Sequence, residues 1–146
     1  MGKKIRLERD VYQEPGRVFS VTIPASTPVF ANRSLAGAVW SVTINGALAE
    51  SAELMAACLM PDHLHLLMGV KKENLIDLIG RWKRFTQRIA KGAGGRVTLW
   101  QKSFYDHALR RDEQISIVAQ YIYENPVRKG LIEEGKTYPY RWHAWL

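Results

Sequence analysis

The chain has 146 residues, of which 47% are hydrophobic and 24% charged, with a formal net charge of +7. This length suits one domain spanning residues 1–146 with a buried core, and the composition excludes intrinsic disorder. The single cysteine, Cys58, excludes an internal disulfide, and neither a leader-like segment nor an apolar run of about 18 residues is seen. We therefore expect a protein of the reducing cytoplasm that does not associate with membranes.

The first half of the chain predicts one strand, one helix and two further strands. Residues 17–23 alternate and are rich in β-branched side chains, which is typical of a strand. Asn32 can cap a helix that runs to about Asn45. Residues 53–60 and 63–70 then predict two strands, separated by a break at Pro61-Asp62.

The second half predicts two helices around a fourth strand. Apolar residues recur every 3.6 positions over residues 73–90, which is the clearest helix, and a strand follows near residues 103–108. A last helix begins near Asp112, which can act as its N-cap, and ends at Asn125-Pro126. Its buried stripe consists of Ile115, Val118, Ala119 and Ile122.

This order of elements predicts an α+β fold of the ferredoxin-like or RNA-recognition-motif (RRM-like) type. Its antiparallel sheet has helices on one face, and the last helix is free to lie near the other face. We expect the aromatic residues of the tail to pack over the core; they are Tyr138, Tyr140, Trp142 and Trp145.

Two histidines stand two positions apart in the expected third strand, within Met60-Pro-Asp-His-Leu-His-Leu-Leu-Met68. Residues i and i+2 of a strand point to the same face, so His63 and His65 lie side by side. Leu64, Leu66 and Met68 then line the opposite face, toward the helices. Paired imidazoles supply half of a metal site, although histidines in strands are more often structural.

Positive charge is concentrated in the middle of the chain. Residues 71–111 hold 11 Lys and Arg against three acidic residues, a net charge of +8 where the whole chain carries +7. Such a segment is typical of proteins that bind nucleic acids. Along the helix expected at residues 73–90, the cations where a phosphate backbone would dock are Arg81, Lys83, Arg84, Arg88 and Lys91.

Tyr121 and Asn125 are four residues apart on the expected last helix, so their side chains project within about 40° of each other. Tyr121 lies beside the buried stripe of that helix. If the helix covers the open face of the sheet, both side chains look toward the two histidines. Tyrosines in such positions more often pack at the rim of a core, so spacing alone assigns no chemical role.

Three segments together resemble the single-tyrosine HUH transposases, and in particular their REP-associated tyrosine transposase (RAYT-like) branch. In the family's order and spacing they are Met60-Pro-Asp-His-Leu-His-Leu-Leu67, Leu99-Trp-Gln-Lys-Ser-Phe-Tyr-Asp-His107 and Tyr121-Ile-Tyr-Glu-Asn-Pro-Val-Arg-Lys-Gly-Leu131. The resemblance covers about residues 17–142. Asp62 stands where the family usually has Asn, and we expect it to point away from the histidine face. Phe19-Ser-Val-Thr22 replaces the family's Tyr-His-Val-Thr string.

The resemblance implies a metal-dependent endonuclease or transposase acting on single-stranded DNA. Such an enzyme nicks and rejoins DNA at hairpin or repeat sequences through a covalent 5′-phosphotyrosine. By motif position Tyr121 is the nucleophile, and Mg²⁺ or Mn²⁺ is the expected cofactor. The ligands of the ion are then His63, His65 and Asn125, with Glu124 as an alternative to Asn125. His107 is a candidate for supporting the site by contacting one of these ligands, and a structural role in its strand is the alternative.

The partner implied by the resemblance is single-stranded DNA with hairpin or palindromic repeats, in the nucleoid of a prokaryote. A homodimer is compatible with the family, and the sequence does not determine which subunit's tyrosine serves a site. Three other interpretations stay open. They are a non-catalytic hairpin-binding module, a domesticated HUH protein, and a histidine-triad phosphohydrolase, which would need a third histidine where Leu67 stands.

Overall fold

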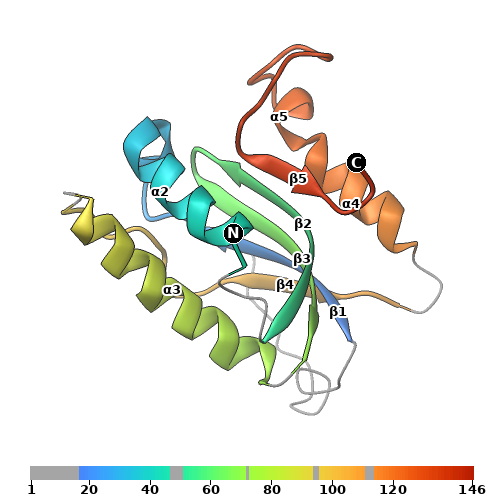
Figure 1. The fold of residues 1–146 in the computed structure, drawn as a ribbon, viewed down its shortest axis with the longest axis horizontal. Helices are drawn as coiled ribbons and strands as arrows, with labels where there is room; N and C mark the ends of the chain where they lie inside the picture. Colours follow the sequence, from blue (N-terminus) through green and yellow to red (C-terminus); the bar gives the residue numbers. More distant parts are fainter. Residues whose placement is uncertain (1–16, 47–50, 72, 94–95, 111–113) are drawn as a thin grey trace.

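The computed structural model describes residues 17–46, 51–71, 73–93, 96–110 and 114–146. Five strands form one antiparallel sheet in the order β4-β1-β3-β2-β5 (Figure 1). They are β1 (Val18–Pro24), β2 (Ala52–Met60), β3 (His63–Val70), β4 (Tyr105–Ala108) and β5 (Arg141–His143). The order of the first four strands is that of a ferredoxin-like sheet, which confirms the predicted fold class. The fifth strand comes from the tail and was not predicted.

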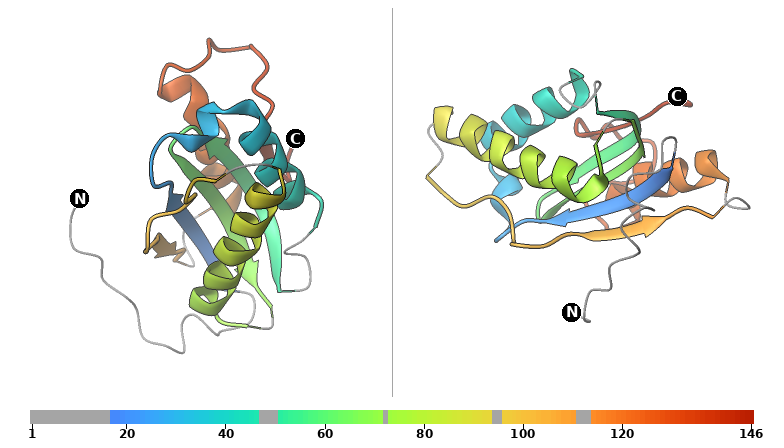
Figure 2. Two further views of the ribbon diagram at one scale, coloured as in Figure 1. Left: turned by 90° about the vertical axis from the view of Figure 1, so that its left-hand side faces the viewer. Right: turned by 90° about the horizontal axis from the view of Figure 1, so that it is seen from below.

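Helices cover both faces of the sheet. A 3₁₀ turn, η1 (Val29–Ala31), leads into α2 (Arg33–Ile44), and α3 (Leu75–Gly92) lies beside α2. Figures 1 and 2 place these two helices on one side of the sheet and α4 (Ile115–Tyr123) on the other. The side chains of Asn32 and Asn74 accept backbone N–H groups at the starts of α2 and α3, which fixes where these helices begin. None of the described helices combines the length and the apolarity needed to cross a bilayer.

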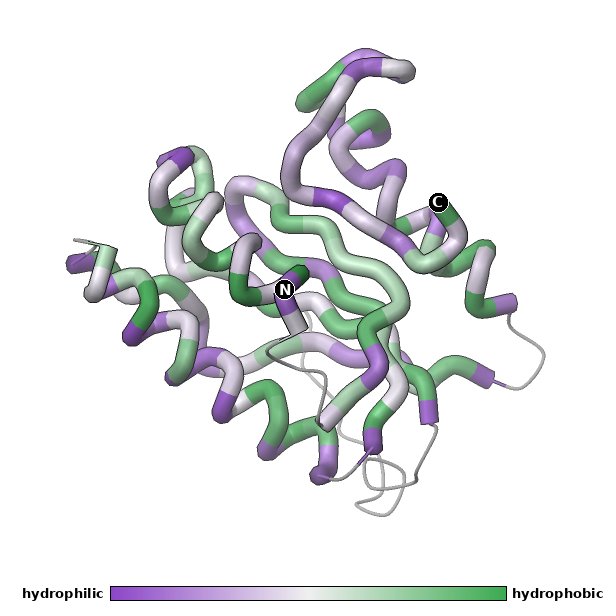
Figure 3. Tube along the Cα trace, viewed as in Figure 1, coloured by the Kyte–Doolittle hydropathy of each residue, from purple (hydrophilic) through white to green (hydrophobic). Residues whose placement is uncertain are grey.

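The larger core lies between the sheet and the pair α2 and α3. Leu64, Leu66 and Met68 of β3 are fully buried there, as the alternation of the strand predicts. The stripe of α3 that includes Leu78 and Trp82 packs onto them. Figure 3 shows the result along α3, where hydrophobic and hydrophilic residues alternate at the helical period.

A smaller core lies between the other face of the sheet and α4. Ala119 and Ile122 are fully buried, Ile115 and Val118 pack beside them, and Cys58, Met60 and Leu67 of the sheet lie beneath. The predicted stripe of the last helix is therefore confirmed. Tyr138 packs against this second core and Tyr140 against the first, as expected, whereas Trp145 is half exposed and packs on neither core, so the prediction is wrong for that residue. Trp142 belongs to β5.

The last helix differs from its predicted form at its end. The helix ends at Tyr123, Glu124 forms the joint, and a separate short helix, α5 (Asn125–Arg128), begins at Asn125. Pro126 causes this break, because it has no N–H to continue the ladder and fits the first turn of a new helix. Tyr121 and Asn125 therefore lie on consecutive helices. Asp112, the expected N-cap, falls outside the described residues, and the structure places Gln114 at that position of α4.

Candidate active site

The two histidines lie side by side on the face of the sheet that α4 covers. Their rings are 6.4 Å apart between centroids, tilted by 57°. His65 is paired with Cys58 of β2 on one side and Thr22 of β1 on the other. The Nε2 atom of His65 lies 3.0 Å from the hydroxyl of Ser20, which sits two positions along β1 from Thr22 and so shares its face.

His63 is held from both of its ring nitrogens. Nδ1 lies 2.8 Å from a carboxylate oxygen of Asp62, and Nε2 lies 3.2 Å from Nδ2 of Asn125. Because a carboxylate only accepts and an amide nitrogen only donates, Nδ1 carries the proton and Nε2 offers a lone pair. The expectation that Asp62 points away from the histidine face is wrong. The residue is in the β2–β3 turn, where strand alternation does not apply.

His65 is a neutral imidazole at physiological pH. Burial is the main cause that lowers its pKa from 6.5 to about 4, and the neighbouring His63 and Arg128 contribute to the same shift. A neutral imidazole keeps the lone pair that binds a metal ion, whereas the protonated ring has none. His65 thus presents the chemical form that a ligand requires.

Asn125 contacts His63, which is 62 residues earlier in the sequence. The side chain is 5% exposed, and its amide nitrogen faces His63 Nε2 at 3.2 Å. Tyr121 precedes it by four residues and is 59% exposed, so its ring lies at the surface. The alternative ligand Glu124 instead accepts a hydrogen bond from Gln120 at 2.7 Å.

Arg128 contacts both Tyr121 and Asn125, and it was not among the site residues predicted from the sequence. Its guanidinium lies 3.6 Å from the centroid of the Tyr121 ring and donates to the Asn125 side-chain oxygen at 3.2 Å. The available signal was its spacing, because Arg128 is seven residues, or two helical turns, after Tyr121. Asp62 and Ser20 were also missed, since their contacts with the histidines depend on a turn and on strand pairing.

His107 lies one strand further from the pair. Its partner in β1 is Ser20, the residue whose hydroxyl meets His65. Directly paired residues share a face of the sheet, so Ser20 stands between the two imidazoles. The structure thus places His107 on the histidine face, where it is exposed and next to Ser20, the residue that contacts His65.

The five predicted DNA-binding cations lie on α3, which packs on the opposite face of the sheet from the histidines (Figure 1). Arg81 forms an ion pair with Glu73, and this pairing lowers the pKa of that carboxyl. Lys83 donates to the backbone oxygen of Gln101 at 2.6 Å. Lys83, Arg84 and Arg88 line one groove of about 430 Å³.

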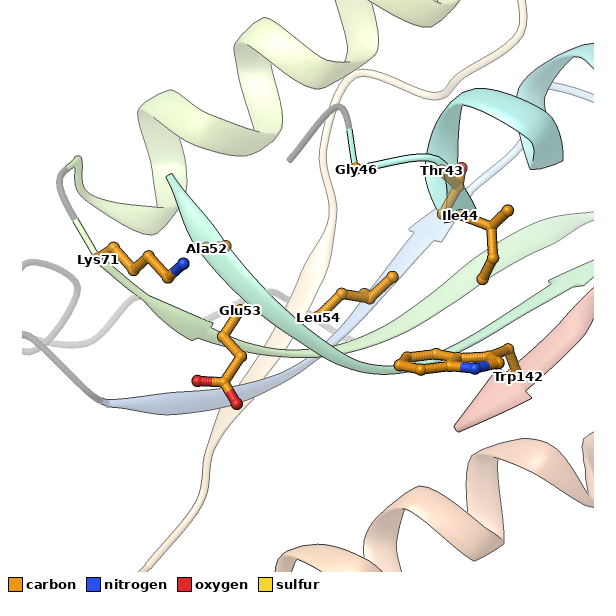
Figure 4. A pocket seen from close by; sticks show the side chains of 8 residues that line it. All are labelled: Thr43, Ile44, Gly46, Ala52, Glu53, Leu54, Lys71 and Trp142. Carbon is orange, nitrogen blue, oxygen red and sulfur yellow. The ribbon is translucent and has the colours of Figure 1, made fainter. Parts of the chain in front are cut away.

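Two other hollows differ in their relation to the histidines. A groove of about 460 Å³ at the β2–β3 turn is lined by Asp62 and His63 and by Lys129 and Leu131, which follow α5. A cavity of about 360 Å³ lies at the end of α2 and the start of β2, beside Trp142 (Figure 4). Its lining contains none of the predicted site residues. Position therefore favours the first groove as the approach to His63.

Comparison with known proteins identifies the class that this fold and site define. Residues 21–125 match the family described as transposase IS200 like, and the chain belongs to that family. It is 33% identical over 100 residues to the "Putative REP-associated tyrosine transposase" of Haemophilus influenzae, covering 60% of this chain and 57% of the relative. It is 27% identical over 88 residues to the REP-associated tyrosine transposase of Escherichia coli, covering 60% and 52%.

The chain thus spans about half the length of the curated relatives it matches. A solved structure titled as a REP-associated tyrosine transposase bound to a REP hairpin has the same fold. Its TM-score is 0.67 at 20% identity, and the match covers 97% of this chain and 82% of that one.

The donor set fits the divalent metal that the family resemblance implies. Within the ranges that the structure describes, no three His, Cys, Asp or Glu side chains are grouped to hold an ion, so the candidate third ligand is a residue of another type. The amide of Asn125 lies at His63 with its nitrogen toward the imidazole and its oxygen toward Arg128, and the oxygen is the atom that would bind an ion. The carboxylate of Asp62 on the far nitrogen of His63 is a common support for metal-binding histidines, because it fixes the tautomer.

Proposed function

We propose that this chain is a single-stranded DNA endonuclease and transposase that cleaves and rejoins DNA through Tyr121. The proposal is supported above all by the contact between His63 and Asn125, which lie 62 residues apart in sequence and 3.2 Å apart in space. This contact places the start of α5 at the paired histidines, and Tyr121 lies four residues earlier on α4. Spacing in the sequence alone does not supply this contact, and it supports a site formed by the histidines and the end of the chain.

In the proposed reaction the Tyr121 hydroxyl oxygen attacks the phosphorus of one phosphodiester. A bond forms from that oxygen to phosphorus, the bond to the 3′ oxygen breaks, the phenol proton is lost and the 3′ oxygen takes up a proton. The products are a 5′-phosphotyrosine and a free 3′-hydroxyl, so the reverse attack can rejoin a strand. His63, His65 and Asn125 would hold Mg²⁺ or Mn²⁺, which when bound neutralises phosphate charge.

We propose single-stranded DNA with a hairpin or palindromic repeat as the substrate. The solved structure with the same fold is titled as bound to a REP hairpin, and this chain has a net charge of +7. The groove beside His63 offers a path for the strand that is cut, with Lys129 as the cation in its lining. The basic groove of α3 would bind a flanking part of the DNA on the other side of the sheet.

The deciding experiment incubates the protein with end-labelled hairpin DNA in Mn²⁺ or in EDTA. We expect a protein–DNA adduct that survives denaturation, forms only with Mn²⁺ and is absent in Tyr121→Phe. The matched control is Tyr123→Phe, two residues away. The Tyr123 ring packs against His143 at 4.9 Å and Arg141 at 4.2 Å, and phenylalanine keeps both ring contacts. If Tyr121→Phe still forms the adduct and Tyr123→Phe does not, the nucleophile is Tyr123 and the proposal is wrong.

His63→Ala separates this function from a non-catalytic hairpin-binding module. Loss of one metal-binding imidazole should abolish the adduct and leave most of the DNA affinity, because phosphate contacts dominate binding. Gel shifts in EDTA measure that affinity. Normal cleavage by His63→Ala would exclude the metal assignment, and binding without any adduct in the unmodified chain would favour the module.

A further inference from the structure

One guanidinium holds both residues that the proposed chemistry takes from the end of the chain. Arg128 donates from Nη1 to the backbone oxygen of Tyr121 at 2.6 Å and from Nη2 to the side-chain oxygen of Asn125 at 3.2 Å. Its central carbon lies 3.6 Å from the centroid of the Tyr121 ring. These contacts span the joint at Glu124, where α4 ends and α5 begins.

The contacts of Arg128 restrict the orientation of the Tyr121 side chain, which the rest of the fold leaves exposed. Tyr121 is 59% exposed, so the packing of α4 on the sheet does little to fix its side chain. A planar guanidinium over the ring face favours one orientation of the ring. The bond to the Tyr121 carbonyl also satisfies an acceptor in the last turn of α4, where carbonyls lack helical partners.

The contact with Asn125 fixes which way its amide points. A guanidinium has donors only, so the group that faces Arg128 must be the amide oxygen. The amide nitrogen then faces His63, where it donates to Nε2. For Asn125 to offer its oxygen to an ion beside His63, the same oxygen must serve both Arg128 and the ion, or the amide must turn over.

We propose that Arg128 is the positioning residue of this site, holding the ring of Tyr121 and the amide of Asn125 in one fixed relation across the α4–α5 joint. The inference rests on the proposed function for its effect on cleavage. Its structural part, the fixed orientation of the amide and the ring, does not depend on that function. Arg128 acts through these two residues, so its loss should slow the reaction and leave DNA binding unchanged.

The kinetic test compares Arg128→Met with Arg128→Lys at saturating Mn²⁺ and DNA. Methionine keeps the aliphatic length and removes the planar donors, and we expect the single-turnover rate of adduct formation to fall by roughly 10²-fold, the cost of a misplaced reacting group. The Kd for hairpin DNA should stay within about twofold of the unmodified protein, because the guanidinium is engaged with Tyr121 and Asn125 and is not expected to bind phosphate. Lysine restores charge without the fork, so Arg128→Lys should remain impaired.

Lys136→Met is the charge-matched control, since Lys136 is exposed and lies outside the site. A rate for Arg128→Met equal to that of the control would overturn the proposal. Full recovery in Arg128→Lys would also overturn it, because a point charge would then suffice. A weaker Kd with an unchanged saturated rate would make Arg128 a DNA contact instead.

A second measurement needs no activity and distinguishes failure of this inference from failure of the proposed function. The side-chain NH₂ pair of Asn125 can be assigned in a ¹⁵N correlation spectrum by its loss in Asn125→Asp. In metal-free protein this pair should be protected from exchange with water, and Arg128→Met should shift it and speed its exchange. If the unmodified chain forms no adduct, this result alone tests the positioning. An Asn125 pair unchanged by Arg128→Met would overturn it.

Discussion

Cys58 faces His65 across the β2–β3 ladder and is fully buried. Burial raises the pKa of this thiol to about 12, although Arg141 and Arg128 oppose the shift. We therefore expect Cys58 to resist thiol reagents in the native protein. At pH 8 its reaction should be slower by at least about 10³-fold than in the unfolded chain, because the thiolate is the reactive form.

The reaction of the single thiol with Ellman's reagent, with and without guanidinium chloride, measures this difference. The same shift predicts how stability depends on pH. Since the folded pKa lies above the unfolded value of about 8.5, the contribution is complete below pH 8.5 and is lost as the pH rises toward 12. Rapid labelling of native protein at pH 8 would show that the α4 face opens readily.

At the scale of elements, β2 shows why alternation in sequence is an incomplete guide to a sheet. The register shifts between Leu54 and Ala56, so Met55 is an extra residue in this strand. Leu54 therefore packs toward α2 and α3, while the even-numbered Ala56 and Cys58 lie under α4. Without this bulge, Cys58 would lie on the opposite face from His65. Strand β3 has no such shift, and its histidines lie where alternation predicted.

Helix α3 is expected to bind DNA through two exposed arginines. Arg84 and Arg88 are exposed and line the same groove, whereas Arg81 is paired with Glu73 and Lys83 with a backbone oxygen. Replacing both by Gln should weaken DNA binding and reduce the slope of log K against log salt by about 1.4, or 0.7 for each lost phosphate contact on a single strand.

Fluorescence anisotropy between 50 and 200 mM salt, roughly the range over which such contacts are screened, gives the slope. Arg33→Gln with Lys136→Gln removes the same charge from exposed positions elsewhere, and should leave the slope near that of the unmodified protein. If the α3 variant keeps the full slope, this helix is not a DNA surface, and binding would be confined to the histidine side of the sheet.

At the scale of the whole molecule, His63 and Asn125 meet within a single chain. We therefore expect each chain to use its own tyrosine. An equimolar mixture of Tyr121→Phe and His63→Ala should form no adduct with hairpin DNA, because neither variant holds a complete site. A dimer that exchanges its last helices would contain one intact composite site, so recovery of the adduct in the mixture would show that Tyr121 acts on a partner's histidines.

Local periodicity in the sequence by itself determined much of this protein. The alternation in β3 placed His63 and His65 on one face, the helical period identified the stripe of α4, and the motifs indicated the transposase family. These features depend on neighbours within a few residues, which the chain's covalent geometry controls. The backbone break at Pro126 was also readable, although not its consequence that Asn125 starts a separate helix.

Only the tertiary structure determined which of these residues and elements are in contact. The approach of Asn125 to His63, the pairing of β5 with β2, the return of Asp62 to His63 and the stacking of Arg128 on Tyr121 all depend on strand order, turns and packing. It also placed the cations of α3 across the sheet from the histidines. The physical reason is that a sequence period selects the face on which a side chain lies, whereas the neighbour it meets there is selected by the burial of the whole core.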